Sequence, residues 1–344
     1  MCAPAAEALG IELRVLAASA DDSAAQVIPH VTVGAHDDLQ ALLAFADGCD
    51  VITFDHEHVP PVYLEAIAAT GVAVRPGPAA LVHAQDKALM RAAMSAAGLP
   101  VPRWRMVADA EEVAAFAGGV WPVVLKTSRG GYDGRGVWIV DSAEAAREVI
   151  QTPLGDGSVW LVEERVDFDM EIAAQVARSP HGQAVAYPVV RTVQSAGMCA
   201  EVVAPAPGIS DEIAVEAQQI ALRIADLLDV TGMLAVEMFA TASGLVINEL
   251  AMRPHNSGHW SIDGAITSQF ENHLRAVLDL PLGAPTMVAP YAVMVNVIGA
   301  EIPDLPPVHT ALRHVLARDP GARVHLYGKE QRARRKLGHV TVIG

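Results

Sequence analysis

Three features of the chain predict an α/β protein, α+β when its whole length is considered. Hydrophobic residues make up 52% of the 344 residues but aromatic residues only 5%, because alanine and valine supply much of the apolar content. Short apolar stretches of strand type alternate with helical stretches at the beginning of the chain. Farther on, a glycine-rich loop joins two strand-like segments. This combination is typical of helices packed on sheets and disfavours a β-sandwich.

The first domain is predicted to alternate strands and helices. We expect helices at 3–9, 38–46 and 62–69 and strands at 12–17, 50–54 and 72–75, the last ended by Pro-Gly-Pro. Short strands separated by helices favour a parallel sheet with helices on its faces.

The elements become longer after residue 83. We expect helices at 85–97, 111–117, 213–228 and 268–278 and strands at 121–126, 137–140, 159–166, 171–177, 233–240, 245–250 and 291–298, followed by a tail of short strands and turns. The strands at 233–240 and 245–250 flank the turn Thr-Ala-Ser-Gly and are predicted to form a hairpin.

Charge and cysteine content exclude several classes of protein. A formal net charge of −16 argues against nucleic-acid binding through a general basic surface. The three cysteines, Cys2, Cys49 and Cys199, have no paired spacing, which argues against a disulfide framework and a zinc site and favours a reducing cytoplasm. We expect no membrane span, because no apolar run approaches the length of about 18 residues that a span requires, and no signal peptide.

The glycine-rich loop is the first candidate site. Gly130, Gly131, Gly134 and Gly136 lie between the strands at 121–126 and 137–140, and Lys126 ends the first strand. Glycines let backbone N–H groups approach a polyanion, and a lysine beside them supplies a charge for phosphates. No helix follows the loop, so it is not a Walker A motif. The alternative is an ordinary long hairpin with flexible glycines.

The second candidate is a pair of acids on the predicted hairpin. Counting outward from the turn places Glu237 and Glu249 opposite each other within about one position, where Cβ atoms lie roughly 5 Å apart. Two such carboxylates repel unless a cation compensates, and Mg²⁺ binds one or two carboxylates together with substrate phosphates. Asn248 adds a neutral oxygen. The alternative is that one acid faces water and the pairing is accidental.

Two further segments are rich in polar groups. The loop at 251–261 gathers Arg253, His255, Asn256 and His259 directly after the second acid strand, a density typical of binding loops. It could equally be a capping loop whose histidines satisfy backbone groups. Acids at 163, 164 and 171 could receive an adenine edge and ribose hydroxyls, but on these residues alone ordinary strand-edge carboxylates are favoured.

Taken together, these motifs resemble the ATP-grasp superfamily, and GGYDGRG at 130–136, INEL at 247–250, RPHNSGHW at 253–260 and GKEQRARRKLGHV at 328–340 resemble the 5-(carboxyamino)imidazole ribonucleotide synthase family. TFDHEHVP at 53–60 is similar to a further segment of that family. The resemblance implies an ATP-grasp fold with a Rossmann-like pre-ATP-grasp domain, a small lid domain and a larger C-terminal domain. The expected divisions are 1–82, 83–162 with the glycine-rich lid, 163–290, and a β-rich segment at 291–344.

The resemblance also implies an activity. Such an enzyme uses ATP, Mg²⁺ and bicarbonate to carboxylate the 5-amino group of 5-aminoimidazole ribonucleotide through carboxyphosphate, in de novo purine (IMP) biosynthesis. A homodimer is also implied. The alternatives are another ATP-grasp enzyme, such as a formate-dependent ribonucleotide transformylase or a biotin carboxylase, and a nucleotide-binding protein without turnover.

Residue roles follow from the same resemblance. Lys87, Lys126, Gly130, Gly131 and Gly134 are implied to contact the ATP phosphates, Glu163, Glu164 and Val166 to belong to the adenine hinge, and Glu171 to bind the ribose. Glu237 and Glu249 are implied to hold Mg²⁺ beside Asn248. Glu57, Tyr132, Arg135, Lys329 and Arg335 are implied to surround the ribonucleotide. The catalytic group is expected to comprise Arg253, His255 and Asn256, around bicarbonate or carboxyphosphate, with Tyr132 and Arg135.

The sequence departs from the family pattern in two places. Gln194 stands where the family commonly has a histidine near a nucleotide contact. A first strand and a GGGQL-type turn precede, in the family, the segment that Met1 matches, and they are not found in this sequence. We expect a chain without that central strand to have a weakened first domain, since strand edges then lack partners.

Overall fold

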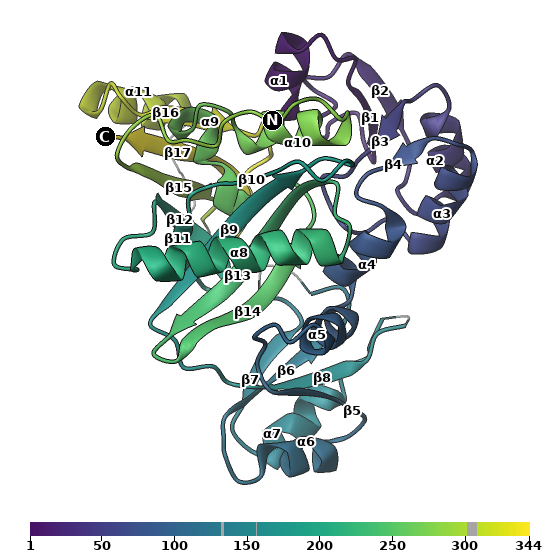
Figure 1. Cartoon of the computed structure of the whole chain (residues 1–344), viewed down its shortest axis with the longest axis vertical. Helices are drawn as coiled ribbons and strands as arrows, with labels where there is room; N and C mark the ends of the chain where they lie inside the picture. Colours follow the sequence, from purple (N-terminus) through teal and green to yellow (C-terminus); the bar gives the residue numbers. More distant parts are fainter. Residues whose placement is uncertain (132–133, 156, 301–307) are drawn as a thin grey trace.

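The computed structural model of the protein describes residues 1–131, 134–155, 157–300 and 308–344. Figure 1 shows three parts: an N-terminal α/β part, a small part built on its own sheet, and a central part built on a large sheet that continues into the C-terminal segment. No helix in the described ranges is long and apolar enough to cross a membrane.

The N-terminal part alternates helices and short strands, as predicted. Its elements are α1 (Cys2–Ala8), β1 (Arg14–Ala17), β2 (His30–Val33), α2 (Leu39–Ala46), β3 (Val51–Ile52), α3 (Pro61–Ala69), β4 (Ala73–Val74) and α4 (Pro78–Gln85). The start of α2 is set by Asp38, whose side chain accepts hydrogen bonds from two backbone N–H groups of the first turn. Strand β2 and helix α4 were not predicted.

Parallel pairing in this part is confirmed, but the prediction of one sheet is wrong. Strand β1 pairs with β2 and β3 pairs with β4, each in parallel, as two separate two-stranded sheets among the described residues. No strand of the described ranges lies between β1 and β3 to join them.

The small part packs helices on an antiparallel sheet. It comprises α5 (Lys87–Ala96), β5 (Trp104–Val107), α6 (Ala110–Ala117), β6 (Val123–Thr127), β7 (Val137–Val140), α7 (Ala143–Ile150) and β8 (Trp160–Glu164). Within the described residues the strand order is β5-β8-β6-β7. Leu125, Val162 and Phe116 belong to its separate apolar core. Strand β8 runs past residue 162, so the expected domain division would cut this sheet.

The predicted helix at 85–97 corresponds to α5, which begins two residues later than predicted. Asp86 has an extended backbone, and its side chain accepts hydrogen bonds from the N–H groups of Ala88 and Leu89. Asp86 therefore ends α4 and caps α5. Its side chain competes with helix formation for the backbone N–H groups, and the apolar pattern of the sequence does not reveal this competition. Helix α7, capped by Ser142, and strand β5 were also missed.

The central part is one large antiparallel sheet. Its strands are β9 (Met170–Arg178), β10 (Ala184–Ala186), β11 (Val190–Ser195), β12 (Met198–Ala204), β13 (Gly232–Thr241), β14 (Gly244–Ala251), β15 (Ala292–Ile298), β16 (Arg323–Leu326) and β17 (Lys336–Ile343). In the described ranges the order is β14-β13-β9-β11-β12-β15-β17-β16, with β10 beside β9. The C-terminal strands therefore extend the same sheet that carries the predicted acid hairpin.

Helices cover this sheet. Helix α8 (Asp211–Leu227) lies across one face in Figure 1 and contributes Ile220 and Ile224 to the largest core. The short helix η1 (Asn256–Gly258), α9 (Ser261–Gly264) and α10 (Gln269–Val277) follow β14, and α11 (Val308–Arg318) precedes β16. The tail was predicted as strands and turns, so α11 corrects that prediction; β10, β11 and β12 were missed as well.

Candidate active site

One large cleft gathers almost every predicted site residue. It encloses about 2060 Å³ between the N-terminal part, the small part and the large sheet. The predicted residues that line it are Glu57, Lys87, Lys126, Gly130, Gly131, Gly134, Glu163, Glu164, Val166, Glu171, Gln194, Glu237, Asn248, Glu249, Arg253, His255, Asn256 and Lys329. Among the described predictions Arg135, Gly136 and Arg335 do not line it, and Tyr132 lies outside the described residues.

Two lysines meet the acid hairpin in this cleft. Lys87 Nζ lies 3.2 Å from Glu249 Oε1 and donates to the carbonyl of Gly131 over 3.3 Å. Lys126 Nζ lies 3.5 Å from Asn248 Oδ1. Cations and oxygen ligands therefore meet beneath the glycine-rich loop. They come from the first residue of α5, the end of β6 and strand β14. Such a group of cations can hold phosphates.

The glycine-rich loop is held by close backbone contacts. Gly130, Gly134 and Gly136 have positive φ angles, which favour glycine over residues with a side chain. A Cβ atom on Gly134 would lie 3.1 Å from the Cα atom of Gly197, in the turn between β11 and β12. The loop therefore reaches the hairpin that carries Gln194 and encloses the cleft from that side.

A buried ion triad orients Lys126. Glu163 Oε2 lies 2.7 Å from Lys126 Nζ, and its Oε1 accepts from Arg91 Nε over 2.7 Å. Burial would raise the pKa of Glu163, but the two cations outweigh it and lower that pKa to about 2. Burial lowers the pKa of Lys126, and repulsion from Arg91 adds to this effect. One carboxylate pairs with two cations, so the triad itself carries a net positive charge.

This triad changes the interpretation of Glu163. Its side chain was considered as a receiver for an adenine edge, but both of its oxygens are engaged by cations. Any hinge contact from this residue must use its backbone. Arg91, almost fully buried on α5, was not predicted, since a lone arginine on a helix gives no sequence signal of its partner.

The other hinge acids differ from Glu163. The Glu164 carboxylate is exposed and accepts from the backbone N–H of Arg103 over 2.8 Å. Burial raises the pKa of Glu171, on β9. Both line the cleft, as does the stacked ring pair Phe168 and Phe239, whose centroids lie 4.6 Å apart and which was not predicted.

The acid hairpin is present, and its two acids lie within the one position that was predicted. Glu237 on β13 is the direct partner of Glu249 on β14, and a β-bulge follows immediately after Glu237. This confirms their opposite placement. Within the described residues no three histidine, cysteine or acidic side chains are arranged to hold a metal ion. Two carboxylates beside a phosphate site nevertheless fit Mg²⁺, which completes its ligand set with water and phosphate oxygens.

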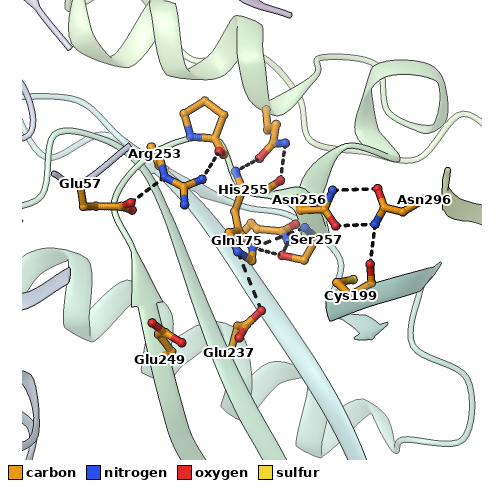
Figure 2. Close-up of polar contacts among 12 residues, drawn as sticks. Glu57, Gln175, Cys199, Glu237, Glu249, Arg253, His255, Asn256, Ser257 and Asn296 are labelled. Carbon is orange, nitrogen blue, oxygen red and sulfur yellow. Dashed lines mark hydrogen bonds and ion pairs between the residues drawn. The ribbon is translucent and has the colours of Figure 1, made fainter. Parts of the chain in front are cut away.

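The loop after β14 contributes Arg253, His255 and Asn256 to the lining of the cleft, and Figure 2 shows Arg253 directed toward Glu57. Arg253 Nε donates to Glu57 Oε2 over 2.8 Å and Nη1 donates to the carbonyl of Pro254. The second oxygen of Glu57, Oε1, is buried and has no hydrogen-bond partner among the described residues. A buried carboxylate oxygen of this kind calls for a donor from a ligand.

His255 is held neutral in the same loop. Burial, with the nearby charges of Arg253 and Lys336, lowers the pKa of His255 to about 3. Its Nδ1 lies 2.8 Å from Ser257 Oγ and its Nε2 lies 3.9 Å from Glu237 Oε1. The imidazole therefore connects the 251–261 loop to the acid hairpin without adding a positive charge at neutral pH.

Asn256 is turned toward the C-terminal strands. Its amide and that of Asn296 on β15 exchange two hydrogen bonds, over 3.0 and 2.7 Å, and Asn296 also donates to the carbonyl of Cys199 (Figure 2). This pairing fixes the loop against β12 and β15. Asn296 was not predicted, because only the fold brings β15 beside the 251–261 loop.

The basic tail reaches the cleft through one predicted residue and one that was not predicted. Lys329 lines the cleft, with its Nζ 5.4 Å from the ring centroid of Tyr327, and so does Lys336. Arg335, predicted as a phosphate ligand, does not line the cleft and donates to the carbonyl of Glu330, so its role stays a prediction. Arg334 donates to the carbonyl of Ala196, in the same turn that the glycine-rich loop approaches. The path of the backbone between residues 329 and 336 determines which of these cationic side chains line the cleft. The sequence does not reveal this path.

The fold and this cleft define the chain as an ATP-grasp protein. The ATP-grasp domain model matches residues 92–270, the ribonucleotide synthetase preATP-grasp domain matches 1–85, and the phosphoribosylaminoimidazole carboxylase C-terminal domain matches 292–344. An N5-carboxyaminoimidazole ribonucleotide synthase of Mycobacterium tuberculosis is 56% identical over 342 residues, covering 99% of this chain and 80% of that protein. The chain belongs to the N5-carboxyaminoimidazole ribonucleotide synthase family.

Solved structures agree with this assignment. The carboxyaminoimidazole ribonucleotide synthase of Aspergillus clavatus complexed with ATP is 32% identical with a TM-score of 0.91, covering 100% of this chain and 90% of that chain. The same enzyme in complex with ADP and 5-aminoimidazole ribonucleotide is 31% identical with a TM-score of 0.90 and the same coverage.

Proposed function

We propose that this protein carboxylates the 5-amino group of 5-aminoimidazole ribonucleotide, using ATP and bicarbonate, to give N5-carboxyaminoimidazole ribonucleotide for purine biosynthesis. One observation carries the proposal. A single cleft joins a phosphate-binding end, with Lys87 and Lys126, to a second end where Glu57 and Arg253 meet. Two substrates bound at these ends would face each other across His255.

The phosphate end suits ATP with Mg²⁺. Lys87, Lys126 and the N–H groups of the glycine-rich loop would contact the phosphates, while Glu237 and Glu249 would hold the ion. Bound Mg²⁺ neutralises charge on the transferring phosphoryl group. The net positive charge of the Arg91–Glu163–Lys126 triad supports the same assignment, because a phosphate would compensate it.

The second end suits bicarbonate and the ribonucleotide. A bicarbonate oxygen would attack the γ-phosphorus, releasing ADP and forming carboxyphosphate. The amino nitrogen would then attack the carboxyl carbon, the bond to the phosphate oxygen would break, and the amine would lose a proton. Arg253 can hold a planar anion in this position, and Glu57 Oε1 can accept from the amino group. Enclosure by the glycine-rich loop would limit hydrolysis of the labile intermediate.

Phosphate release tests this assignment. With ATP, Mg²⁺ and bicarbonate, adding 5-aminoimidazole ribonucleotide is expected to raise the rate of phosphate release, because the second step removes carboxyphosphate productively. Formate in place of bicarbonate should not support the reaction. Stimulation by formate with another ribonucleotide would favour a transformylase, and nucleotide binding without any release would favour a non-catalytic protein.

The tail residues provide a second test. Lys329→Ala is expected to raise the KM for the ribonucleotide roughly 10–100-fold, since a charge-assisted phosphate contact contributes roughly 1.5–3 kcal/mol. The KM for ATP should not change. Arg323→Ala is the control, because Arg323 carries the same charge on strand β16 without lining the cleft. Equal increases in both KM values for Lys329→Ala would contradict its assignment to the ribonucleotide.

We also propose that the protein is a homodimer, as the family resemblance implies. Light scattering of the purified protein during size-exclusion chromatography measures the molar mass directly. A mass equal to that of one chain at micromolar concentration would contradict the dimer.

A further inference from the structure

The hydrogen bonds around His255 specify which ring nitrogen carries the proton. His255 is the N-cap residue of η1, and its side chain accepts from the backbone N–H of Ser257, with 3.4 Å between that nitrogen and Nδ1. A backbone N–H can only donate. A proton on Nδ1 would face this N–H, so this long bond favours a lone pair on Nδ1 and the hydrogen of the neutral ring on Nε2, without fixing them alone.

A second chain of hydrogen bonds supports the same tautomer. Ser257 Oγ lies 2.8 Å from His255 Nδ1, and Gln175 Nε2 donates to that hydroxyl oxygen over 2.7 Å (Figure 2). The hydroxyl oxygen of Ser257 accepts the hydrogen bond from Gln175. The hydroxyl hydrogen is therefore free to be donated to Nδ1 of His255. Gln175 and Ser257 are both almost completely buried, so water does not compete for these bonds.

The geometry points to Gln175 and Ser257 as positioning residues that hold His255 as the Nε2–H tautomer, so that it acts as a hydrogen-bond donor and not as a general base. The inference rests on the proposed function for what this donor meets. Nε2 is the nitrogen that faces Glu237, at the junction of the two ends of the cleft. There it would donate to an oxygen of carboxyphosphate or its transition state.

The chemical consequence is specific. A neutral donor stabilises developing negative charge on oxygen without a positive charge that would also tighten ground-state binding. The lone pair on Nδ1 is occupied by Ser257, so the ring cannot take the proton of the attacking amine unless this hydrogen-bond chain breaks. That proton must leave through another group or water.

Nitrogen NMR of the full-length protein with 15N-labelled histidine tests the tautomer directly. The signals of His255 are identified by comparison with the His255→Gln spectrum. In the wild type at neutral pH we expect a proton on Nε2 and none on Nδ1. A ring protonated on Nδ1, or on both nitrogens, would overturn the proposal. This measurement needs no turnover, so its result is independent of whether the proposed function is right.

Substitutions then test the positioning role. Ser257→Ala is expected to give a mixture of tautomers and to lower kcat by about 10–100-fold, the usual loss when a partner that orients a site residue is removed. The KM for ATP should stay unchanged. Gln175→Met should also lower kcat, but by less than Ser257→Ala, because the hydroxyl of Ser257 remains.

The matched control is Gln218→Met. Gln218, on α8, donates to the carbonyl of Tyr187 and does not line the cleft, so this variant loses a similar hydrogen bond without touching His255. It should keep the wild-type tautomer and rate. Loss of activity in Ser257→Ala with the Nε2–H tautomer intact would show only a structural role and contradict the proposal.

Discussion

Replacing Glu237 or Glu249 with glutamine is expected to lower kcat for ATP turnover by roughly 10²–10³-fold, the range seen when preorganised electrostatic stabilisation is lost. The two carboxylates are direct partners on β13 and β14 and line the cleft beside Lys87 and Lys126. Glutamine keeps the size of each side chain but lowers its affinity for Mg²⁺. Raising the Mg²⁺ concentration should therefore restore part of the lost rate.

The control for this pair is Glu201→Gln. Glu201 lies on β12 of the same sheet and does not line the cleft, so its rate should equal that of the wild type. Melting temperatures of the three variants should be close, because the two site carboxylates repel each other and contribute little to folding. Wild-type rates for both Glu237→Gln and Glu249→Gln at limiting Mg²⁺ would show that these residues do not bind the ion.

Glu163→Gln is expected to cost about 3–5 kcal/mol in free energy of unfolding, the usual effect of breaking a buried ion pair from one side. The substitution leaves Arg91 and Lys126 buried without the carboxylate that both contact at 2.7 Å. It should also raise the KM for ATP, because Lys126 loses the group that orients it. Chemical denaturation measures the first effect and steady-state kinetics the second.

The neighbouring acid supplies the comparison. Glu164→Gln alters an exposed carboxylate, and exposed ion pairs contribute about 0–1 kcal/mol. A loss of stability for Glu163→Gln no larger than that for Glu164→Gln would mean that the triad does not stabilise the fold.

The same triad predicts a pH dependence. The pKa of Glu163 is lowered to about 2 in the folded protein, below its ordinary value of 4.5. Its contribution to stability is therefore complete above the pKa of the unfolded chain and is lost as pH falls from about 5 toward 2. Over this range the stability of Glu163→Gln should fall less steeply than that of the wild type.

Local patterns in the sequence predicted much of the site. The spacing of Glu237 and Glu249 from the turn predicted their placement to within one position, because register in a short hairpin is set by its turn. The β-bulge after Glu237, which makes Glu249 its direct partner in place of Asn248, was not predicted. Lys126 could be associated with the glycines of the loop because they are neighbours in the chain.

Contacts between distant segments were not predictable in this way. Arg91 with Glu163, Gln175 with Ser257, and Asn256 with Asn296 each join residues 40 or more positions apart. Their partners depend on sheet order, which periodicity does not reveal. The division of α4 from α5 depended on one capping side chain, Asp86, and the choice of inward-facing cations in the tail depended on backbone turns.

Carbon NMR with 13C-labelled bicarbonate tests the central claim most directly. The protein is incubated with labelled bicarbonate, ATP, Mg²⁺ and 5-aminoimidazole ribonucleotide, and the spectrum is recorded with time. We predict a labelled carboxyl carbon bonded to nitrogen, formed in step with ADP and absent when ATP or the ribonucleotide is omitted. ADP formation in the complete mixture with no labelled carbon on nitrogen would contradict the account.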